Sequence, residues 1–169
     1  LEVNVQSFSS WATLGLMLLW SARMGMHLFF NRILSHKEDS RYQRLMNHSG
    51  ASWKWVFLIF FLLQVFFIFI FLFPIKAAME TSQTSFLVFQ VIGLIIGCLA
   101  LVGETFSDIQ LNRFASNPEN KQKVCKDGFW RYSRHPNYFF EWLFWCSFVG
   151  LASGSGHIYT ALIGPVVMY

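Results

Sequence analysis

The sequence predicts an all-α integral membrane protein, a polytopic helical bundle with three spanning helices and a C-terminal helical hairpin or pair. Of its 169 residues, 54% are hydrophobic and only 13% are charged, whereas soluble domains carry about 25% charged residues. Long apolar runs recur along the chain, and most cations gather in two segments between these runs. The 19% share of aromatic residues also excludes a disordered chain, because disordered chains are poor in aromatic residues.

The first predicted span covers residues 11–30, about the length that crosses the hydrocarbon core. It contains Arg23, which lies about 13 Å from Arg32 along a helix that rises 1.5 Å per residue. A cation at that depth is costly and usually faces a partner or a wet cavity. We therefore expect Arg23, with His27 on the same helix face, to meet Glu141 or Glu104 in the bundle interior. An ion pair that only fixes the packing would leave the same pattern.

Residues 53–74 and 86–103 are predicted as the second and third spans. The second is a run of Phe, Leu and Ile, and the third carries Gly93 and Gly97, a spacing that lets two helices approach closely. The polar residues Glu104, Asp108 and Asn112 follow at intervals of four, so they form one stripe on a continuing helix. This stripe fits a solvated helix end, a set of ribose-hydroxyl acceptors or metal ligands, and the spacing does not choose among them.

Two shorter apolar segments, residues 138–152 and 158–169, are predicted at the C-terminal end of the chain. A Ser-Gly-Ser-Gly turn at residues 153–156 separates them. Each is short for a full span, which favours a helical hairpin or pair. The chain starts with Leu1 and stops inside an apolar run, so we expect residues 1–169 to be one transmembrane domain of a longer protein.

The distribution of cations predicts the orientation. Eleven of the thirteen Lys and Arg residues lie in or beside the segments 31–52 and 104–137. Two spans separate these segments, so both lie on one side, and the excess of cations marks that side as cytoplasmic. Because the cations flank apolar spans, we expect contact with membrane lipids and no nucleic-acid partner. The three Cys form no CxxC pair, and the five His show no paired spacing within one span, so no metal or haem site is predicted.

Residues 128–141 carry the densest set of functional groups. Arg131, Arg134 and His135 can bind phosphates, and the proline that follows presets the first turn of a helix whose free N–H groups favour anions. Asn137 and Glu141 lie one turn apart on one face of that helix. The segment therefore predicts a site for an anionic cofactor at the membrane edge. An interfacial belt of aromatic residues and cations is the alternative, but it does not account for the inward-facing amide and carboxylate.

Four pieces of the chain resemble the steroid 5-alpha-reductase superfamily, and specifically its bacterial branch of uncharacterised membrane proteins. The pieces are residues 20–27 (WSARMGMH), 38–42 (EDSRY), 104–110 (ETFSDIQ) with Phe114, and 128–141 (GFWRYSRHPNYFFE). Together they extend the resemblance over nearly the whole chain. The RHPNY core of the last piece is also similar to that of sterol reductases and, more loosely, to that of isoprenylcysteine and phospholipid methyltransferases.

The resemblance implies an NADPH-dependent reductase of a carbon–carbon double bond, whose lipophilic steroid-, sterol- or isoprenoid-like substrate enters from the bilayer. It also implies a bacterial inner-membrane location. The residues that the motifs and the segment 128–141 together assign to the cofactor site are Glu104, Asp108, Arg131, Arg134, His135, Asn137, Tyr138 and Glu141. Glu104 stands where the steroid reductases have an Asn, and the family has a further cytoplasmic tail that completes the cofactor site.

Three residues are candidates for the proton or hydrogen-bond donor to the substrate: Tyr42, Arg23 and His27. The steroid reductases use a Glu and a Tyr on early helices for this purpose, and no residue here aligns with that Glu. Two other functions stay open at this point. A methyltransferase using S-adenosylmethionine shares the RHPNY core, and a non-catalytic lipid-binding membrane protein would need no nucleotide at all.

Overall fold

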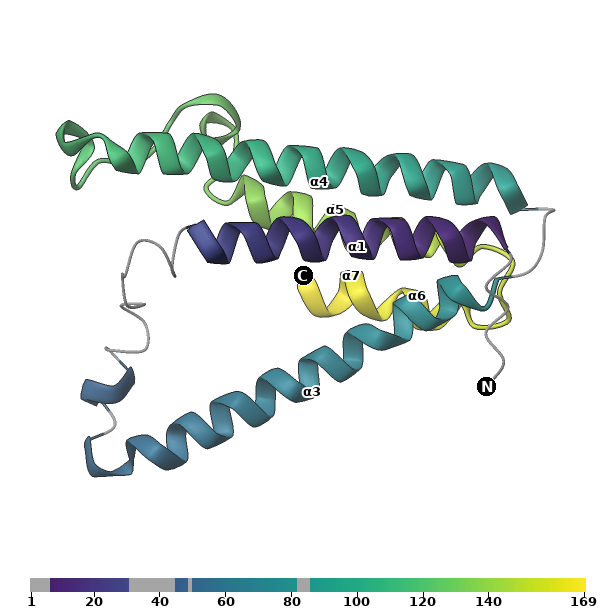
Figure 1. Ribbon diagram of the computed structural model, residues 1–169, viewed down its shortest axis with the longest axis horizontal. Coiled ribbons are helices and arrows are strands. Elements are labelled where there is room, and N and C mark those ends of the chain that lie inside the picture. The colour runs from purple at the N-terminus through teal and green to yellow at the C-terminus, as the bar shows by residue number, and fades with distance from the viewer. Residues whose placement is uncertain (1–6, 31–44, 49, 82–85) are drawn as a thin grey trace.

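The computed structural model describes residues 7–30, 45–48, 50–81 and 86–169, and this part of the chain contains helices and no strand. Its α-helices are α1 (Phe8–Leu28), α3 (Trp53–Met79), α4 (Leu87–Ser116), α5 (Pro136–Leu151), α6 (Ile158–Ala161) and α7 (Ile163–Met168). Helices α1, α4 and α5 run roughly along one direction, and α3 is inclined to them (Figure 1). Short 3-10 turns lie at Gly50–Ser52 (η2), Pro118–Asn120 (η4) and Gly128–Arg131 (η5). The fold class is therefore all-α, as the sequence predicts.

Two helices, α3 and α4, are long and apolar enough to cross a membrane by length and composition. The 21-residue helix α1 has the predicted place but lower hydropathy, because Ser9, Ser10, Thr13, Arg23 and His27 lie within it. The two spans with the cleanest apolar pattern are thus confirmed as candidates. A third span at α1 stays a prediction.

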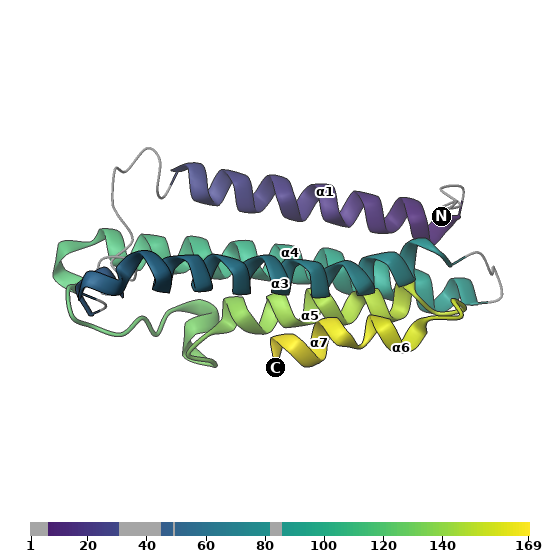
Figure 2. The same cartoon turned by 90° about the horizontal axis from the view of Figure 1, so that it is seen from below.

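The closest helix packing is between α4 and α5, which run side by side in Figures 1 and 2. A Cβ added to Gly93 would lie 2.7 Å from the carbonyl oxygen of Ser147 and 2.9 Å from the amide nitrogen of Leu151. One added to Gly150 would lie 2.9 Å from the Cα of Gly93. The backbones approach because neither glycine carries a side chain, which is the role predicted for the small-residue spacing in this span.

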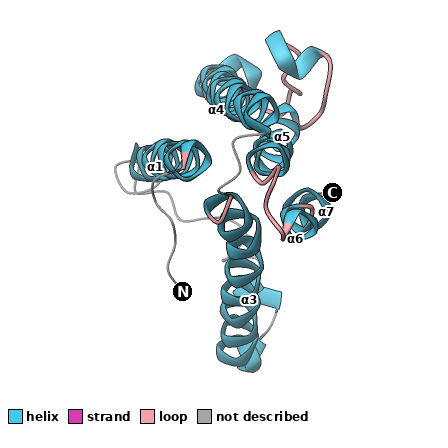
Figure 3. Ribbon diagram, turned by 90° about the vertical axis from the view of Figure 1, so that its right-hand side faces the viewer, coloured by secondary structure: helices cyan, strands magenta, loops and turns pink. Residues whose placement is uncertain are grey.

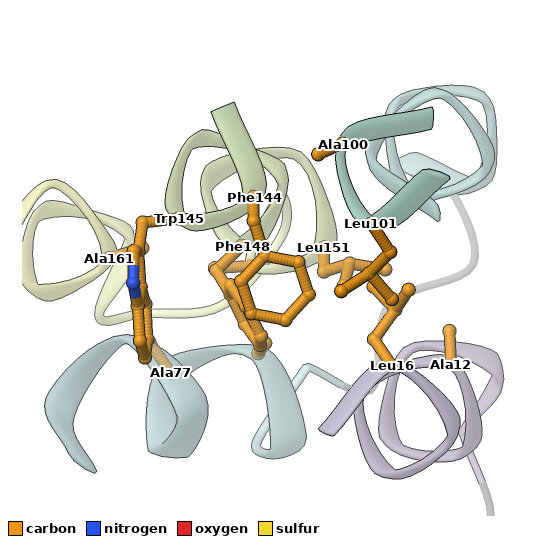
Figure 4. Close-up of a cluster of buried hydrophobic side chains, with 12 residues drawn as sticks. Ala12, Leu16, Ala77, Ala100, Leu101, Phe144, Trp145, Phe148, Leu151 and Ala161 are labelled. Carbon is orange, nitrogen blue, oxygen red and sulfur yellow. The ribbon is translucent and has the colours of Figure 1, made fainter. Parts of the chain in front are cut away.

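The core is built where α5 meets its neighbours (Figure 4). Phe144, Phe148 and Leu151 of α5 are fully buried, and Leu16 of α1 packs into the same cluster. Small residues of α3 and α4, such as Ala77 and Ala100, supply the facing surfaces. Burying a side chain of this size stabilises a fold by about 1.5–3 kcal/mol, so α5 is the central element of the bundle.

Helices α1 and α3 meet at one end only. Ser9 donates its hydroxyl proton to a pair of carbonyl oxygens, those of Ala78 at 2.8 Å and Leu151 at 2.7 Å, and Ser10 donates to Met79 at 2.8 Å. From there α3 diverges from α1 and α4 (Figures 1 and 3). No residue in the most apolar 18-residue stretch of α3 is buried, so this helix presents its Phe and Leu side chains outward.

The C-terminal segments form the predicted hairpin. After α5 the chain turns at residues 152–157 and returns as α6 and α7, which lie against α5 and α3 (Figure 2). The indole N–H of Trp142 donates to the carbonyl oxygen of Pro165 at 3.1 Å. Helix α4 continues without a break to Ser116, so the polar stripe that begins at Glu104 lies on a helix, as its spacing predicts.

Candidate functional site

A buried ion cluster lies between α1 and α4. The guanidinium of Arg23 donates to Glu104 at 2.5 Å and to Asp108. The exposed fractions of these side chains are 13%, 3% and 13%. The predicted pairing of Arg23 with Glu104 is thus confirmed. Glu141, the alternative partner, makes no ion pair with Arg23 among the described residues.

Helical spacing brings the cluster together. Glu104 and Asp108 are four residues apart, so their carboxylates stack on the face of α4 that meets α1. Arg23 and His27 are also four apart on α1, and Nδ1 of His27 lies 3.6 Å from Oδ2 of Asp108. The cationic pair on α1 therefore faces the acidic pair on α4. The planar guanidinium of Arg23 can bind both carboxylates at once.

The first turn of α5 joins the same cluster. The Asn137 amide donates from Nδ2 to Oδ1 of Asp108 at 3.4 Å. Several buried polar atoms here have no hydrogen-bond partner among the described residues: Oδ1 of Asn137, Oε2 of Glu104 and the indole nitrogen of Trp20. Each comes from a different helix of the group α1, α4 and α5. Unpaired polar atoms are costly in a folded protein, so those of Glu104 and Asn137, two members of the cluster, indicate a place for a polar ligand group.

A basic cavity opens beside this cluster. Its volume is about 910 Å³, within the range of small-molecule and cofactor sites. The lining residues are Leu111, Val124, Cys125, Lys126, Trp130, Arg131, Arg134 and His135. Tyr138 stacks its ring on that of His135 with 5.3 Å between the centroids. The cavity thus combines four groups that can bind anions with the start of a helix, where free N–H groups also favour anions.

The loop that carries these cations is fixed to α4 by two hydrogen bonds. The indole N–H of Trp130 donates to the carbonyl oxygen of Ser107 at 2.9 Å. The amide N–H of Phe129 donates to Oε1 of Gln110 at 3.0 Å. Gly128 makes this approach possible, because its φ is +55° and an added Cβ would lie 2.3–2.5 Å from the Gln110 side chain.

We expect Gly128→Ala to lower the free energy of unfolding by about 1–2 kcal/mol, the typical cost of a left-handed residue with a Cβ. The methyl group would also displace the side chain of Gln110. Thermal unfolding in detergent measures the change. Gly156→Ala is the matched control, because a Cβ there meets nothing within 4 Å. Equal unfolding temperatures for the two variants would contradict this account of the loop.

A second, smaller groove of about 330 Å³ lies between α1 and α4. Its polar lining includes Arg23, His27, Thr105, Asp108 and Asn112, with apolar side chains around them. The groove therefore opens onto Arg23 and Asp108 of the buried cluster.

The predicted site residues fall into two adjoining groups. Arg23, one of the donor candidates, meets three cofactor residues in the buried cluster: Glu104, Asp108 and Asn137. Two further cofactor residues lie on α5: Tyr138 stacks on His135, and Glu141 follows one turn after Asn137. The three remaining cofactor residues line the cavity: Arg131, Arg134 and His135. His27 borders the groove, and Tyr42 lies outside the described residues.

Two members of the site are not predicted by the sequence. Lys126 lines the basic cavity. Its position two residues before the motif that starts at Gly128 could have indicated this role. Trp20 stacks against Phe144 of α5 with 6.3 Å between the ring centroids, one turn from Arg23. The position of Trp20 in the sequence does not indicate a role in the site, because most Trp residues of membrane proteins contribute to packing or lie at the membrane interface.

The chain matches, over residues 2–169, a family described as "Protein of unknown function (DUF1295)". This family is related to steroid 5-alpha-reductase-like membrane proteins. No curated protein and no solved structure matches the chain.

Proposed function

We propose that this chain, which belongs to the DUF1295 family, is a membrane-embedded reductase that uses NADPH to saturate a carbon–carbon double bond in a lipophilic substrate. The observation that carries the proposal is the junction at Asn137. This residue hydrogen-bonds to the buried cluster through Asp108 and comes two residues after His135, which lines the basic cavity. One elongated ligand can therefore place an anionic part in the cavity and a polar ring in the cluster.

The residues present fit NADPH on both sides of that junction. Lys126, Arg131 and Arg134 suit its phosphate groups, and Arg binds phosphate through a bidentate fork. The unpaired atoms of Asn137 and Glu104 suit the carboxamide of a nicotinamide. Bound NADPH would supply the hydride, while the protein supplies position and field.

The charge of the cavity favours NADPH over S-adenosylmethionine. S-adenosylmethionine carries a sulfonium cation and no phosphate, so a lining rich in Lys and Arg contributes little to its binding affinity. A purely lipid-binding protein would use the same cations for headgroups, but it would not need the polar cluster in the bundle interior. Both alternatives are distinguished from the reductase by the binding experiment below.

The substrate would reach the cluster from the bilayer. Helices α1, α3 and α4 carry many exposed large apolar side chains, which suit lipid contact. Hydride transfer to an enone places charge on its carbonyl oxygen, and a fixed donor in a dry site stabilises that charge. Arg23 and His27 are the described candidates for this donor, and Tyr42 is the third.

We further propose that the cofactor side faces the cytoplasm of a bacterial inner membrane, with α1 as an additional span. The cations of segments 31–52 and 104–137 support this orientation. The basic cavity lies on the same side, because all of its lining residues fall within segment 104–137. A cytoplasmic opening would give the site direct access to the cellular nucleotide pool.

The direct test is nucleotide binding to the purified full-length protein in detergent, comparing NADPH, NADH and S-adenosylmethionine. We expect NADPH to bind, and Asn137→Ala and Glu141→Ala each to weaken it by about tenfold or more, because one lost polar contact to a buried ligand is worth about 1.4 kcal/mol. Asn117→Ala is the control, since Asn117 is exposed and its side chain bonds only to the local amide of Glu119.

Each outcome of this experiment has a definite meaning. Unchanged NADPH affinity in both variants would contradict the placement of the cofactor. Selective binding of S-adenosylmethionine would replace the reductase by a methyltransferase. A folded protein that binds none of the three ligands would favour a lipid-binding function and leave the ion cluster as a structural feature.

A further inference from the structure

The groove between α1 and α4 carries its polar residues inside and its apolar residues outside. Arg23 and Asp108 line it with only 13% of each side chain exposed. Met26, Phe30 and Ile109 also line it, and these three are exposed apolar side chains. A ligand that fits this lining has a polar end that points inward and an apolar body that faces lipid.

The groove lies where its two helices leave the hydrocarbon. A helix that rises 1.5 Å per residue crosses about 30 Å in about 20 residues, so α4, which starts at Leu87, completes its crossing near residue 106. The lining residues of α4 fall within 105–112 and those of α1 within 23–30. A polar ligand end in the groove is therefore at the depth of the lipid headgroups. Toward the bilayer centre, α1 and α4 present exposed apolar side chains such as Leu19 and Val102.

Two of the lining side chains carry N–H groups that suit a ligand oxygen. Arg23 donates to two carboxylates of the buried cluster, and the hydroxyl of Thr105 donates to a backbone carbonyl oxygen one turn back at 2.7 Å. The other N–H groups of the lining side chains belong to His27, which is one-third exposed, and to the exposed Asn112. Both residues can donate to an oxygen acceptor such as a carbonyl group.

The charges of the lining favour an uncharged polar end. The cation Arg23 and the carboxylate of Asp108 pair with each other, so the groove offers no excess of either fixed charge. An anionic headgroup would lie against the carboxylate and a cationic one against the guanidinium. Like charges in contact repel strongly away from water.

Asp108 places the groove next to the proposed cofactor site. Its Oδ1 accepts a hydrogen bond from Asn137 of α5 at 3.4 Å, whereas its Oδ2 accepts from Arg23 and lies 3.6 Å from Nδ1 of His27. One carboxylate therefore contacts both the residue that suits the nicotinamide and the side chains that line the groove. Ligands on its two sides are neighbours.

We propose that the groove between α1 and α4 holds the polar end of the substrate, and that the substrate is an uncharged amphiphile whose reducible double bond is conjugated to a carbonyl group at that end. This inference rests on the proposed function. The carbonyl oxygen accepts hydrogen bonds from His27 and Asn112, and the apolar body extends along the exposed faces of α1 and α4. A double bond in the middle of a lipid chain does not fit, because the bilayer centre lies about 15 Å from this depth.

The site can be located without cofactor, by photo-cross-linking to the full-length protein in vesicles of phosphatidylethanolamine and phosphatidylglycerol. The probe is a long-chain alkyl cyclohexenone with a diazirine beside its ring. We expect labelled peptides that cover residues 23–30 and 105–112, and an excess of the enone without the diazirine should remove the label. Label that lies elsewhere, or that the competing enone leaves in place, overturns the proposal.

Filling the groove tests the same site by affinity. Ile109→Trp should weaken binding of the alkyl cyclohexenone by about tenfold or more, because the larger ring occupies the lined space, while the affinity for NADPH stays at the wild-type value. Val102→Trp is the matched control, since Val102 is exposed on the same helix and lies outside the groove lining. Equal affinity of the two variants for the enone overturns the assignment.

The role of the carbonyl group is tested with an alkyl cyclohexene, which is the same probe without its oxygen. The wild type should bind the enone about tenfold more tightly than this analogue, because only the enone accepts hydrogen bonds. His27→Phe and Asn112→Leu should reduce that preference, whereas a purely structural loss would weaken both probes equally. A preference that is unchanged in both variants overturns the placement of the carbonyl group.

A single turnover at saturating NADPH separates this inference from the proposed function. The alkyl cyclohexenone should be reduced about tenfold faster or more than a lipid of equal length with its enone at mid-chain, because only the first places its double bond in the groove. Equal rates, or the opposite order, overturn the inference. If NADPH binds and the enone does not label the groove, this inference alone fails. If the enone labels the groove and NADPH does not bind, the reductase function fails and the groove stands as a site for uncharged amphiphiles.

Discussion

Arg23→Met is expected to lower the free energy of unfolding by about 3–5 kcal/mol, the usual cost of removing one partner of a buried ion pair. The guanidinium is the shared partner of Glu104 and Asp108, and all three side chains are at least 87% buried. Without it, the two carboxylates stay buried and lose the guanidinium that pairs with both. Thermal or denaturant unfolding in detergent measures the loss, and Arg23→Lys should recover only part of it, because an ammonium lacks the planar fork.

Lys76→Met is the matched control for this prediction. Lys76 pairs with Glu80 at 3.7 Å, one turn away on α3, and its side chain is 53% exposed. Exposed pairs of this spacing contribute about 0.3–0.5 kcal/mol. If both variants unfold at the temperature of the wild type, the interior of the bundle is wet enough to solvate the carboxylates, and the cluster does not stabilise the fold.

The second large effect is expected at the contact between α4 and α5. Gly93→Ala places a methyl group 2.7 Å from the carbonyl oxygen of Ser147 and 2.9 Å from the amide nitrogen of Leu151. Both neighbours are backbone atoms, so α4 and α5 must separate to admit it. We expect a loss of about 1–3 kcal/mol from overpacking, which exceeds the helix-propensity gain of about 1 kcal/mol.

Gly15→Ala is the control that measures the gain in helix propensity without overpacking. Gly15 lies inside α1, and a Cβ there meets no atom within 4 Å. This variant should unfold at the same temperature as the wild type or higher, with a gain of up to about 1 kcal/mol. Stabilisation of both variants would mean that α4 and α5 are not in close contact.

Composition and periodicity were sufficient for the helices. The apolar runs at α3 and α4 and the spacing of Gly93 and Gly97 are local properties of the chain, and the helices appear where these patterns predict them. The polar stripe that starts at Glu104 has helical spacing, so the continuation of α4 to Ser116 follows from the same argument. The boundaries are less exact, because helix ends depend on the loops that leave them.

The site was only partly predictable. A cation inside an apolar helix implies a partner, and the sequence narrowed the partner of Arg23 to two carboxylates. It did not predict that Arg23 bridges Glu104 and Asp108, because that depends on the rotation of α1 against α4. Lys126 was likewise counted as one cation among many, since only the fold of the loop brings it to the cavity.

The sequence by itself therefore determined the class of the protein, the order of its helices and the segments that carry polar chemistry. Each of these follows from interactions between residues that are near in the chain. Only the tertiary structure decided the contacts of α5 with α4, among them the hydrogen bond from Asn137 to Asp108 that links the cluster to the basic cavity. Those contacts join helices far apart in sequence, and they are set by how closely the glycines of α4 let α5 approach.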